Sequence, residues 1–177
     1  YDASGNKLSS TDPLGRITTT AYDAAEHFFP VQVANAIGHT LATSYDPGTG
    51  AVLSTTDPNS QVTRNIYDPL GRLTAVVGPL DTDAEPGVRY QYNLTTLPTR
   101  VTKEVKSAFG VSPSNPAVYY ATHSFADGLG RTIQTRSPAE DPTKQIVSGN
   151  PVFGPRGETV AQSLPYFDFV SSSYSIA

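Results

Sequence analysis

The chain has 177 residues, a formal net charge of −4, 37% hydrophobic residues, and no Cys, Met or Trp. This composition excludes a disulfide framework and any metal site with cysteine ligands, and no cluster of Lys and Arg indicates a nucleic-acid-binding surface. No apolar run approaches the ~18 residues that a membrane-spanning helix needs, so we expect no transmembrane helix.

The clearest motif in the chain is a turn at residues 67–72, with the sequence Tyr-Asp-Pro-Leu-Gly-Arg. An Asp at the first turn position accepts hydrogen bonds from backbone amides ahead of it, Pro fixes φ, and Gly takes a positive φ without a Cβ clash. A type I turn followed by a left-handed Gly commonly closes a β-hairpin. The motif therefore predicts a hairpin turn.

Related turns recur along residues 1–78 at intervals of 10 to 12 residues. They begin at Asp2, Asp12, Asp23, Asn35, Asp46, Asp57 and Asp68, and every second one follows a tyrosine: Tyr1, Tyr22, Tyr45 and Tyr67. The motif glycines are Gly5, Gly15, Gly38 and Gly71, and the arginines that follow them are Arg16 and Arg72. Such a period predicts one supersecondary unit stacked many times, with the tyrosines along one edge. The turns at 23–26 and 57–60 lack the glycine, so we expect them to be reshaped rather than strained.

The segments between these turns read as strands. They are residues 7–10, 17–21, 29–34, 40–44, 52–55, 62–66 and 73–77. No segment keeps the apolar spacing of an amphipathic helix. Ser and Thr crowd the strands, and because Thr forms strands well but fills a core poorly, we expect a single-layer sheet with both faces partly wet.

Residues 79–117 interrupt the repeat and are predicted to form an irregular hairpin insertion with loops. Asp81, Asp83 and Glu85 superficially resemble a calcium loop, but the glycine and the distant glutamate of that motif are missing. We therefore predict a solvated loop at 79–87 and no metal site. Residues 88–94 alternate cleanly and are expected to pair with 99–108, and 112–116 are expected to form another loop.

The motif returns in residues 118–177, which we interpret as degenerate repeats. Asp127, Gly130 and Arg131 keep its core, and residues 153–158 are a weaker copy with Gly in place of Asp. Strands are predicted at 118–124, 132–136, 145–148 and 159–163. The aromatic stretch 165–169 is expected to dock against a neighbouring element. Because the sequence starts inside a motif copy at Tyr1, we expect it to be a fragment of a longer chain.

The pattern Tyr-Asp-x-x-Gly-Arg at a spacing near 21 residues resembles the YD or RHS repeat of bacterial polymorphic toxins, of the B and C subunits of insecticidal Tc toxin complexes, and of animal teneurins. The resemblance covers residues 1–78 and, more loosely, 118–163. The block from 125 to 158 is similar to the junction region of Tc B-subunit or virulence-plasmid-B-like proteins. The resemblance implies an all-β fold of repeated antiparallel β-hairpins that form part of a large curved sheet or hollow shell. The self-cleaving aspartyl protease of RHS proteins belongs to a C-terminal core motif with no matching position here, so no catalytic residue is carried over.

Each repeated residue type has a structural and a functional interpretation. The arginines Arg16, Arg72 and Arg131 are expected to pair with turn carboxylates or with carbonyls of the next hairpin; binding of acidic sugars is the alternative. The tyrosine column is expected to be a packing ladder between hairpins, with a carbohydrate-stacking platform as the alternative. His39 is interpreted as a polar residue beside a turn and His123 as a surface or lumen residue of a strand.

The leading hypothesis is a non-enzymatic structural segment of a secreted bacterial toxin shell that encloses a C-terminal toxic effector and helps to deliver it, without a cofactor. Its expected partners are other segments of the same shell, the enclosed effector and, as a further candidate, a pore-forming toxin subunit. The alternative is an extracellular adhesion or carbohydrate-binding module of the teneurin or RHS type, whose partner would be a cell-surface glycan.

Overall fold

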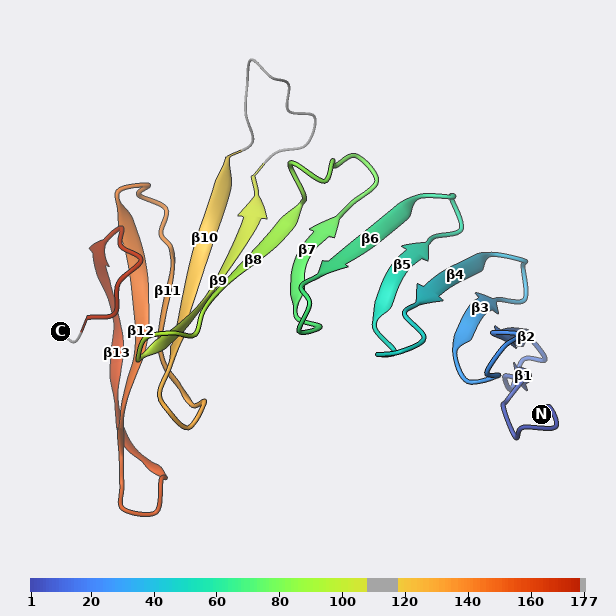
Figure 1. The fold of residues 1–177 in the computed structure, drawn as a ribbon, viewed down its shortest axis with the longest axis horizontal. Coiled ribbons are helices and arrows are strands. Elements are labelled where there is room, and N and C mark those ends of the chain that lie inside the picture. Colours follow the sequence, from blue (N-terminus) through green and yellow to red (C-terminus); the bar gives the residue numbers. More distant parts are fainter. Residues whose placement is uncertain (108–117, 176–177) are drawn as a thin grey trace. The chain divides into compact units, whose positions relative to one another are not determined.

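The computed structural model describes residues 1–107 and 118–175, and the regular secondary structure of these residues consists of β-strands alone (Figure 1). The chain divides into two compact units: unit 1 is Tyr1–Gly87 and unit 2 is Val88–Ala177. The all-β hairpin fold predicted from the repeat is confirmed. The boundary between the units falls inside the predicted insertion, and the three-part division by sequence pattern stays a prediction. The loop predicted at 112–116 lies outside the described residues.

Unit 1 is an antiparallel meander in which each strand pairs with the next one along the chain. Its strands are β1 (Ser9–Thr11), β2 (Ile17–Tyr22), β3 (Pro30–Ala34), β4 (Thr40–Tyr45), β5 (Val52–Thr56), β6 (Val62–Tyr67) and β7 (Leu73–Val77). Every strand predicted for residues 1–78 is present, shifted by at most a few residues. The short turns leave each strand no other partner within reach.

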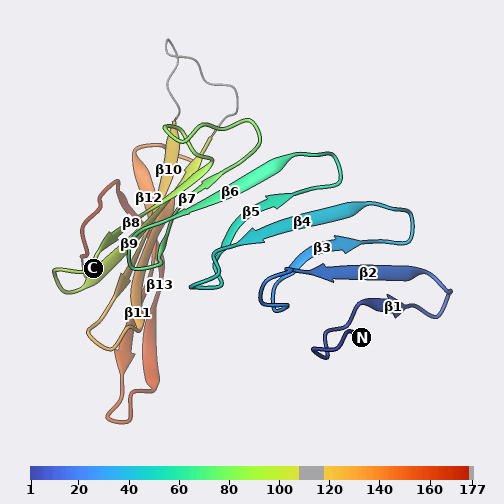
Figure 2. The ribbon, with the colours of Figure 1, turned by 45° about the vertical axis from the view of Figure 1, so that its right-hand side comes forward.

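Unit 2 is a second antiparallel meander. Its strands are β8 (Val88–Asn93), β9 (Thr99–Lys106), β10 (Tyr119–Ala126), β11 (Thr132–Pro138), β12 (Lys144–Phe153) and β13 (Thr159–Phe169). The predicted hairpin between 88–94 and 99–108 is present as β8 and β9. Strands β12 and β13 are the longest and run past the other strands of unit 2 to the turn that joins them (Figures 1 and 2).

The aromatic stretch 165–169 contacts a neighbouring element, as expected: it is the end of β13 and pairs with β12. Phe169 pairs with Lys144, and Tyr166 pairs with Val147. The predicted strand at 159–163 is therefore too short, since β13 continues through Pro165 to Phe169. Proline is tolerated at a sheet edge or at an irregularity, and the register of β13 shifts beside Pro165.

The two units differ in what they bury. Strands β1–β6 contain no buried side chain, as expected for a sheet with two wet faces. Unit 2 buries a row of side chains on one face of its sheet: Thr102, His123, Phe125, Gln134, Arg136, Gln145 and Val147. Thr102, His123, Arg136 and Val147 are cross-strand partners on successive strands. The core of unit 2 is therefore mostly polar.

Candidate functional site

The repeated turns share one hydrogen-bond pattern, in which the first residue holds the rest of the turn. Its side-chain Oδ1 accepts hydrogen bonds from the backbone amides of the third and the fifth residue, as Asp12 does from Leu14 at 2.9 Å and from Arg16 at 3.0 Å. The same pair of bonds is made by Asp2, Asn35, Asp57, Asp68 and Asp127. The backbone amide of the fourth residue also donates to the carbonyl of the first, which is the bond of a type I turn.

The fourth residue of these turns lies in the left-handed region. Gly15 has a φ of 78° and Gly71 a φ of 77°, and Gly5, Gly38 and Gly130 share this conformation. Ser60 occupies the same position with a φ of 61° and keeps the same hydrogen bonds. The expectation that the 57–60 loop would be reshaped is wrong, because the bonds to Asp57 outweigh a conformational cost on the order of 1 kcal/mol.

Two turns at the tyrosine edge are enlarged. Asp23 accepts hydrogen bonds from the amides of Glu26, Phe28 and Phe29. These bonds, the one from Glu26 first, lower the pKa of the Asp23 carboxyl to about 2. This loop is reshaped, as expected from its missing glycine. At the next turn of this edge, Asp46 is followed by an additional residue, and Gly50 rather than Gly48 takes the positive φ, of 72°.

The arginines that follow the glycines turn back onto the aspartates. Nε of Arg16 lies 2.7 Å from Oδ2 of Asp12, and Nε of Arg72 lies 2.6 Å from Oδ2 of Asp68. In unit 2, Arg131 pairs with Asp127 at 2.7 Å and also lies over the ring of Phe153, 3.6 Å from its centroid. Its guanidinium therefore joins its own turn to the adjacent hairpin.

The carboxylates of Asp12 and Asp68 are held in their charged form. The backbone amide of Arg16 lowers the pKa of Asp12, and the backbone amide of Arg72 does the same for Asp68. Each carboxylate uses one oxygen for two amides and the other for a guanidinium. A group saturated in this way is poorly suited to proton transfer, which needs a pKa near the working pH.

The tyrosines connect successive repeats within unit 1. The hydroxyl of Tyr67 donates to the carbonyl of Val52 at 2.9 Å, and that of Tyr45 donates to the carbonyl of Pro30 at 3.4 Å. Val52 is the cross-strand partner of Tyr45, and Pro30 is that of Tyr22. Each of these two tyrosines therefore bonds the backbone beside the preceding tyrosine, and the ring of Tyr45 also stacks on Phe29 at a centroid distance of 5.0 Å. Tyr1 at the start of the column is 84% exposed.

The pairing of adjacent strands shifts in register beside the tyrosines, and the sequence pattern did not predict this shift. It falls beside Tyr22, Tyr45 and Tyr67, and a fourth shift falls beside Ala126 in unit 2. The hairpins closed at Asp12, Asn35 and Asp57 show none. The tyrosine edge of unit 1 thus carries one additional residue per repeat, and such bulges bend a strand and increase its twist. The residues skipped in the pairing, Val31, Leu53 and Thr74, share no residue type, so composition and spacing did not reveal these bulges.

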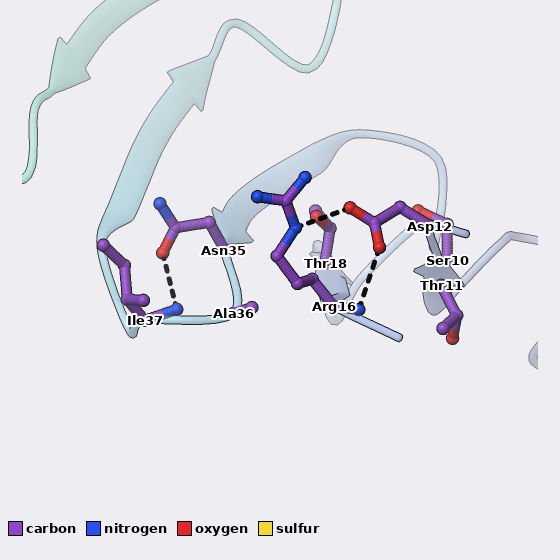
Figure 3. Close-up of a pocket in the computed structure, with 8 residues that line it drawn as sticks. All are labelled: Ser10, Thr11, Asp12, Arg16, Thr18, Asn35, Ala36 and Ile37. Carbon is purple, nitrogen blue, oxygen red and sulfur yellow. Dashed lines mark hydrogen bonds and ion pairs between the residues drawn. The ribbon is translucent and has the colours of Figure 1, made fainter. Parts of the chain in front are cut away.

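A hollow of about 430 Å³ lies between two turns on the other edge of unit 1 (Figure 3). It is lined by Ser10, Thr11, Asp12, Arg16, Thr18, Asn35, Ala36 and Ile37. The Arg16 guanidinium beside it is held by Asp12, and Ile37 is 75% exposed. The hollow is open to solvent, and its lining combines the Asp12–Arg16 ion pair and hydroxyl groups with apolar side-chain surface.

The acidic loop after β7 does not gather its carboxylates around one point. Asp81 accepts a hydrogen bond from the amide of Gly78 at 3.0 Å, whereas Asp83 pairs with Arg64. Within the described residues, no group of three His, Asp or Glu side chains is arranged to hold a metal ion. Nor does that part of the chain contain a helix long and apolar enough to span a membrane.

His123 is not a surface or lumen residue, because it is only 7% exposed. Its Nδ1 lies 2.9 Å from the hydroxyl of Thr102 on the adjacent strand. Burial lowers its pKa, and the nearby positive charge of Arg100 acts in the same direction. The alternation of His123 with Phe125 along β10 is the signal that could have placed both side chains on the buried face.

The RHS Repeat family model matches residues 1–27 and 45–83 of this chain. These two segments are RHS repeats. They contain four of the tyrosine-edge turns described above and the hairpin turns at Asp12 and Asp57. Residues 28–44, with the turn at Asn35, fall between the two matched segments but keep the same turn geometry.

Solved structures with the same fold are toxin components. The chain matches "Crystal Structure of TcdB2-TccC3" with a TM-score of 0.69 at 18% identity, over 92% of this chain and 10% of that one. It matches "Crystal Structure of TcdB2-TccC3 without hypervariable C-terminal region" with a TM-score of 0.69 at 15% identity, over 95% of this chain and 13% of that one. It also matches "Crystal Structure of TcdB2-TccC3-Cdc42" with a TM-score of 0.67 at 14% identity, over 92% of this chain and 12% of that one. No curated protein sequence matches.

The chain thus resembles components of Tc toxins in fold, and it spans roughly a tenth of the length of the solved chains. At this identity the likeness concerns architecture alone. An RHS fold whose repeated carboxylates are bonded inside turns indicates a structural rather than a catalytic role.

Proposed function

We propose that this chain is a structural segment of a secreted bacterial toxin shell that encloses a C-terminal toxic effector and helps to deliver it. The observation that carries the proposal is the repeated turn. Its carboxylates and amides bond within the hairpin, and the Tyr45 and Tyr67 hydroxyls bond between repeats. A wall built from such hairpins offers few mobile backbone segments to a protease.

The surface of unit 1 suits containment of a partly unfolded polypeptide. Strands β1–β6 bury no side chain and carry many Ser and Thr residues. Because hydrophobic attraction scales with the apolar area removed from water, a solvated sheet face rich in Ser and Thr binds an unfolded cargo weakly. The additional residue per repeat on the tyrosine edge supports curvature of the sheet, since bulges bend the strands that contain them.

The partners that follow from this role are adjacent segments of the same shell, the enclosed effector and a pore-forming toxin subunit. The three solved structures named above all contain TcdB2 together with TccC3, and one contains Cdc42 as well. An extracellular location and the absence of catalysis by this segment are parts of the same proposal. The proposed shell role requires neither a cofactor nor a nucleic acid.

Limited proteolysis of the full-length natural polypeptide that carries this sequence tests the proposal. The effector segment is expected to resist a protease that digests the free effector. A triple variant, Asp12→Ala, Asp68→Ala and Asp127→Ala, should expose it by loosening three turns, whereas Asp83→Ala in the acidic loop serves as the control. Equal digestion of enclosed and free effector would refute containment.

A glycan-binding role is the second candidate, and one observation favours it. The hollow beside Arg16 presents a guanidinium, hydroxyls and an amide at a turn edge (Figure 3), which are groups that bind acidic sugars. Binding to a glycan array that is lost with Arg16→Ala, or with Tyr22→Ala and Tyr45→Ala together, would support this role. If the chain bound no glycan on the array, the glycan-binding role would be contradicted.

A further inference from the structure

The segment that follows β13 folds back over the buried face of unit 2. We call residues 170–175 the strap. Its contacts reach three strands: Gln145 on β12, Gln134 and Arg136 on β11, and Arg100 on β9. The strap therefore crosses the strands instead of extending the sheet.

Side chains of the sheet hold the strap mainly by its backbone. The amide of Ser171 donates to Oε1 of Gln145 at 3.0 Å, and the carbonyl of Ser172 accepts a hydrogen bond from Arg100. Just before the strap, the carbonyl of Phe169 accepts one from Arg136 at 3.5 Å. Backbone groups are the same in every peptide, so these contacts do not select a sequence.

Gln134 pairs with Ser175 in both directions. Its Nε2 donates to the carbonyl of Ser175 at 2.5 Å, and its Oε1 accepts the Ser175 amide hydrogen at 3.4 Å. The side-chain amide of Gln134 thus makes the two hydrogen bonds that a backbone residue of a neighbouring strand would make. This geometry is suited to an extended peptide, whose amide and carbonyl are both available.

The groups that make these contacts are buried, whereas the strap itself is not. Gln134, Arg136 and Gln145 are 0%, 1% and 3% exposed, and each strap residue is half-buried or exposed. Buried polar side chains require partners, so this face is built to receive polar backbone. A segment with few buried atoms opens at low cost, so it can leave without unfolding the sheet.

Two strap side chains add selectivity. The ring of Tyr174 packs against Phe125 at a centroid distance of 5.8 Å, and the hydroxyl of Ser175 accepts a hydrogen bond from Arg136. Ser171 instead accepts a hydrogen bond from the amide of Ser173 within the strap. The recognised pattern is therefore an aromatic residue followed by serine.

We propose that this face of unit 2 is a binding groove for extended polypeptide segments, in which the strap is the resident occupant. A segment with an aromatic residue followed by serine binds the same groove when the strap is displaced. The groove is defined by Gln134, Arg136 and Gln145, with Phe125 as its apolar position. This activity goes beyond the shell role and does not depend on it.

The test uses a fluorescently labelled, C-terminally amidated peptide, Val-Ser-Ser-Ser-Tyr-Ser, which reproduces residues 170–175. The full chain with Tyr174→Ala and Ser175→Pro has a weakened strap, since proline lacks the amide hydrogen that Gln134 accepts. Fluorescence anisotropy should show the peptide binding this variant about tenfold more tightly than the unchanged chain. Adding Gln134→Leu should abolish the gain, and the control peptide Val-Ser-Ser-Ser-Ser-Tyr, which has the same composition but no serine after the tyrosine, should bind more weakly.

Equal binding to the variant and the unchanged chain, or binding that does not depend on Gln134, would overturn the proposal. Circular dichroism establishes that the variants keep their β-structure. Hydrogen exchange on the unchanged chain gives a second test that requires no variant. The amides of Ser171 and Ser175 should exchange faster than the paired amides of β11 and β12; exchange at the same rate would mean that the strap does not leave, and the groove would not be available.

Discussion

Two ion pairs with nearly the same geometry summarise the difference between the units. Arg16 lies 2.7 Å from Asp12 in unit 1, and Arg136 lies 2.8 Å from Asp168 in unit 2. The Arg16 side chain is 67% exposed, whereas that of Arg136 is 1% exposed. The first pair joins residues within one turn and the second joins residues far apart in the chain. We therefore expect the two pairs to contribute unequally to stability although their distances are similar.

The comparison extends to the whole of each unit. In unit 1, the turns are closed by their own residues and the tyrosines reach only the adjacent repeat, as in other repeat proteins whose units contact only their neighbours. In unit 2, the buried row lies across four strands and is covered by the strap. We expect a substitution in unit 1 to act locally and one in the buried row to destabilise several strands together.

The largest effect is expected from Arg136→Ala. The change removes the ion pair with Asp168 and the hydrogen bonds to Gln134 and Ser175, and it opens a cavity, so it should lower the free energy of unfolding of unit 2 by about 3 kcal/mol. Hydrogen exchange of the β11 and β12 amides measures the loss. The matched variant Arg16→Ala removes an exposed ion pair and should change the exchange of β1 and β2 only slightly. Similar losses for the two variants would show that burial does not separate the units.

The next effect is expected from Gly149→Ala. Gly149 has a φ of 104°, and a Cβ there would lie 2.8 Å from the carbonyl oxygen of Ile133. Strain and overlap together should cost unit 2 about 2 kcal/mol. Gly15→Ala is the control in unit 1, since Gly15 is also left-handed but a methyl group added there would meet no atom within 4 Å.

Denaturant unfolding of the two variants, followed by circular dichroism, makes this comparison. The Gly15 variant should lose about 1 kcal/mol, which is the cost of the left-handed conformation alone. If Gly149→Ala were no more harmful than Gly15→Ala, the close approach of β12 to β11 would have no part in the stability of unit 2.

The hairpins could be predicted from sequence because their determinants are local. Aspartate, proline and glycine at fixed offsets specify each turn, and the segments between them have no alternative partner. The row that contains His123, Gln134 and Arg136 could not be predicted, because its burial depends on strand registers and on a strap that begins many residues later. Polar residues in a strand usually indicate a solvated face, and here that rule led to the wrong placement of His123.

The pH dependence of unit 2 should differ from that of unit 1 because of His123. Burial holds its pKa below the ordinary value of 6.5, with Arg100 and Arg136 opposing protonation and Glu104 favouring it. The stabilisation from the neutral ring is present above pH 6.5 and is lost as the pH falls below that value, because the unfolded chain then binds the proton more readily. Asp12 and Asp68 add no pH dependence in this range, since their pKa values are lowered from 3.8 and the stabilisation they give is lost only at more acidic pH.

Urea unfolding at about pH 7.5 and about pH 5.5 isolates this effect. The unchanged chain should be less stable at the lower pH, and His123→Gln should reduce the difference. His39→Gln, in an exposed turn of unit 1, should leave the difference as it is. A pH dependence that persists in the His123 variant would assign the effect to another group.

The smallest effect is expected at Ser60, the non-glycine residue that keeps the left-handed turn conformation in unit 1. Ser60→Gly removes a conformational cost on the order of 1 kcal/mol but adds freedom to the unfolded chain, so the net gain should be under about 1 kcal/mol. Hydrogen exchange of the β5 and β6 amides should slow slightly, while exchange in unit 2 stays unchanged. Loss of stability would mean that the serine makes a contribution of its own, and slowing in unit 2 would contradict the local character of the repeats.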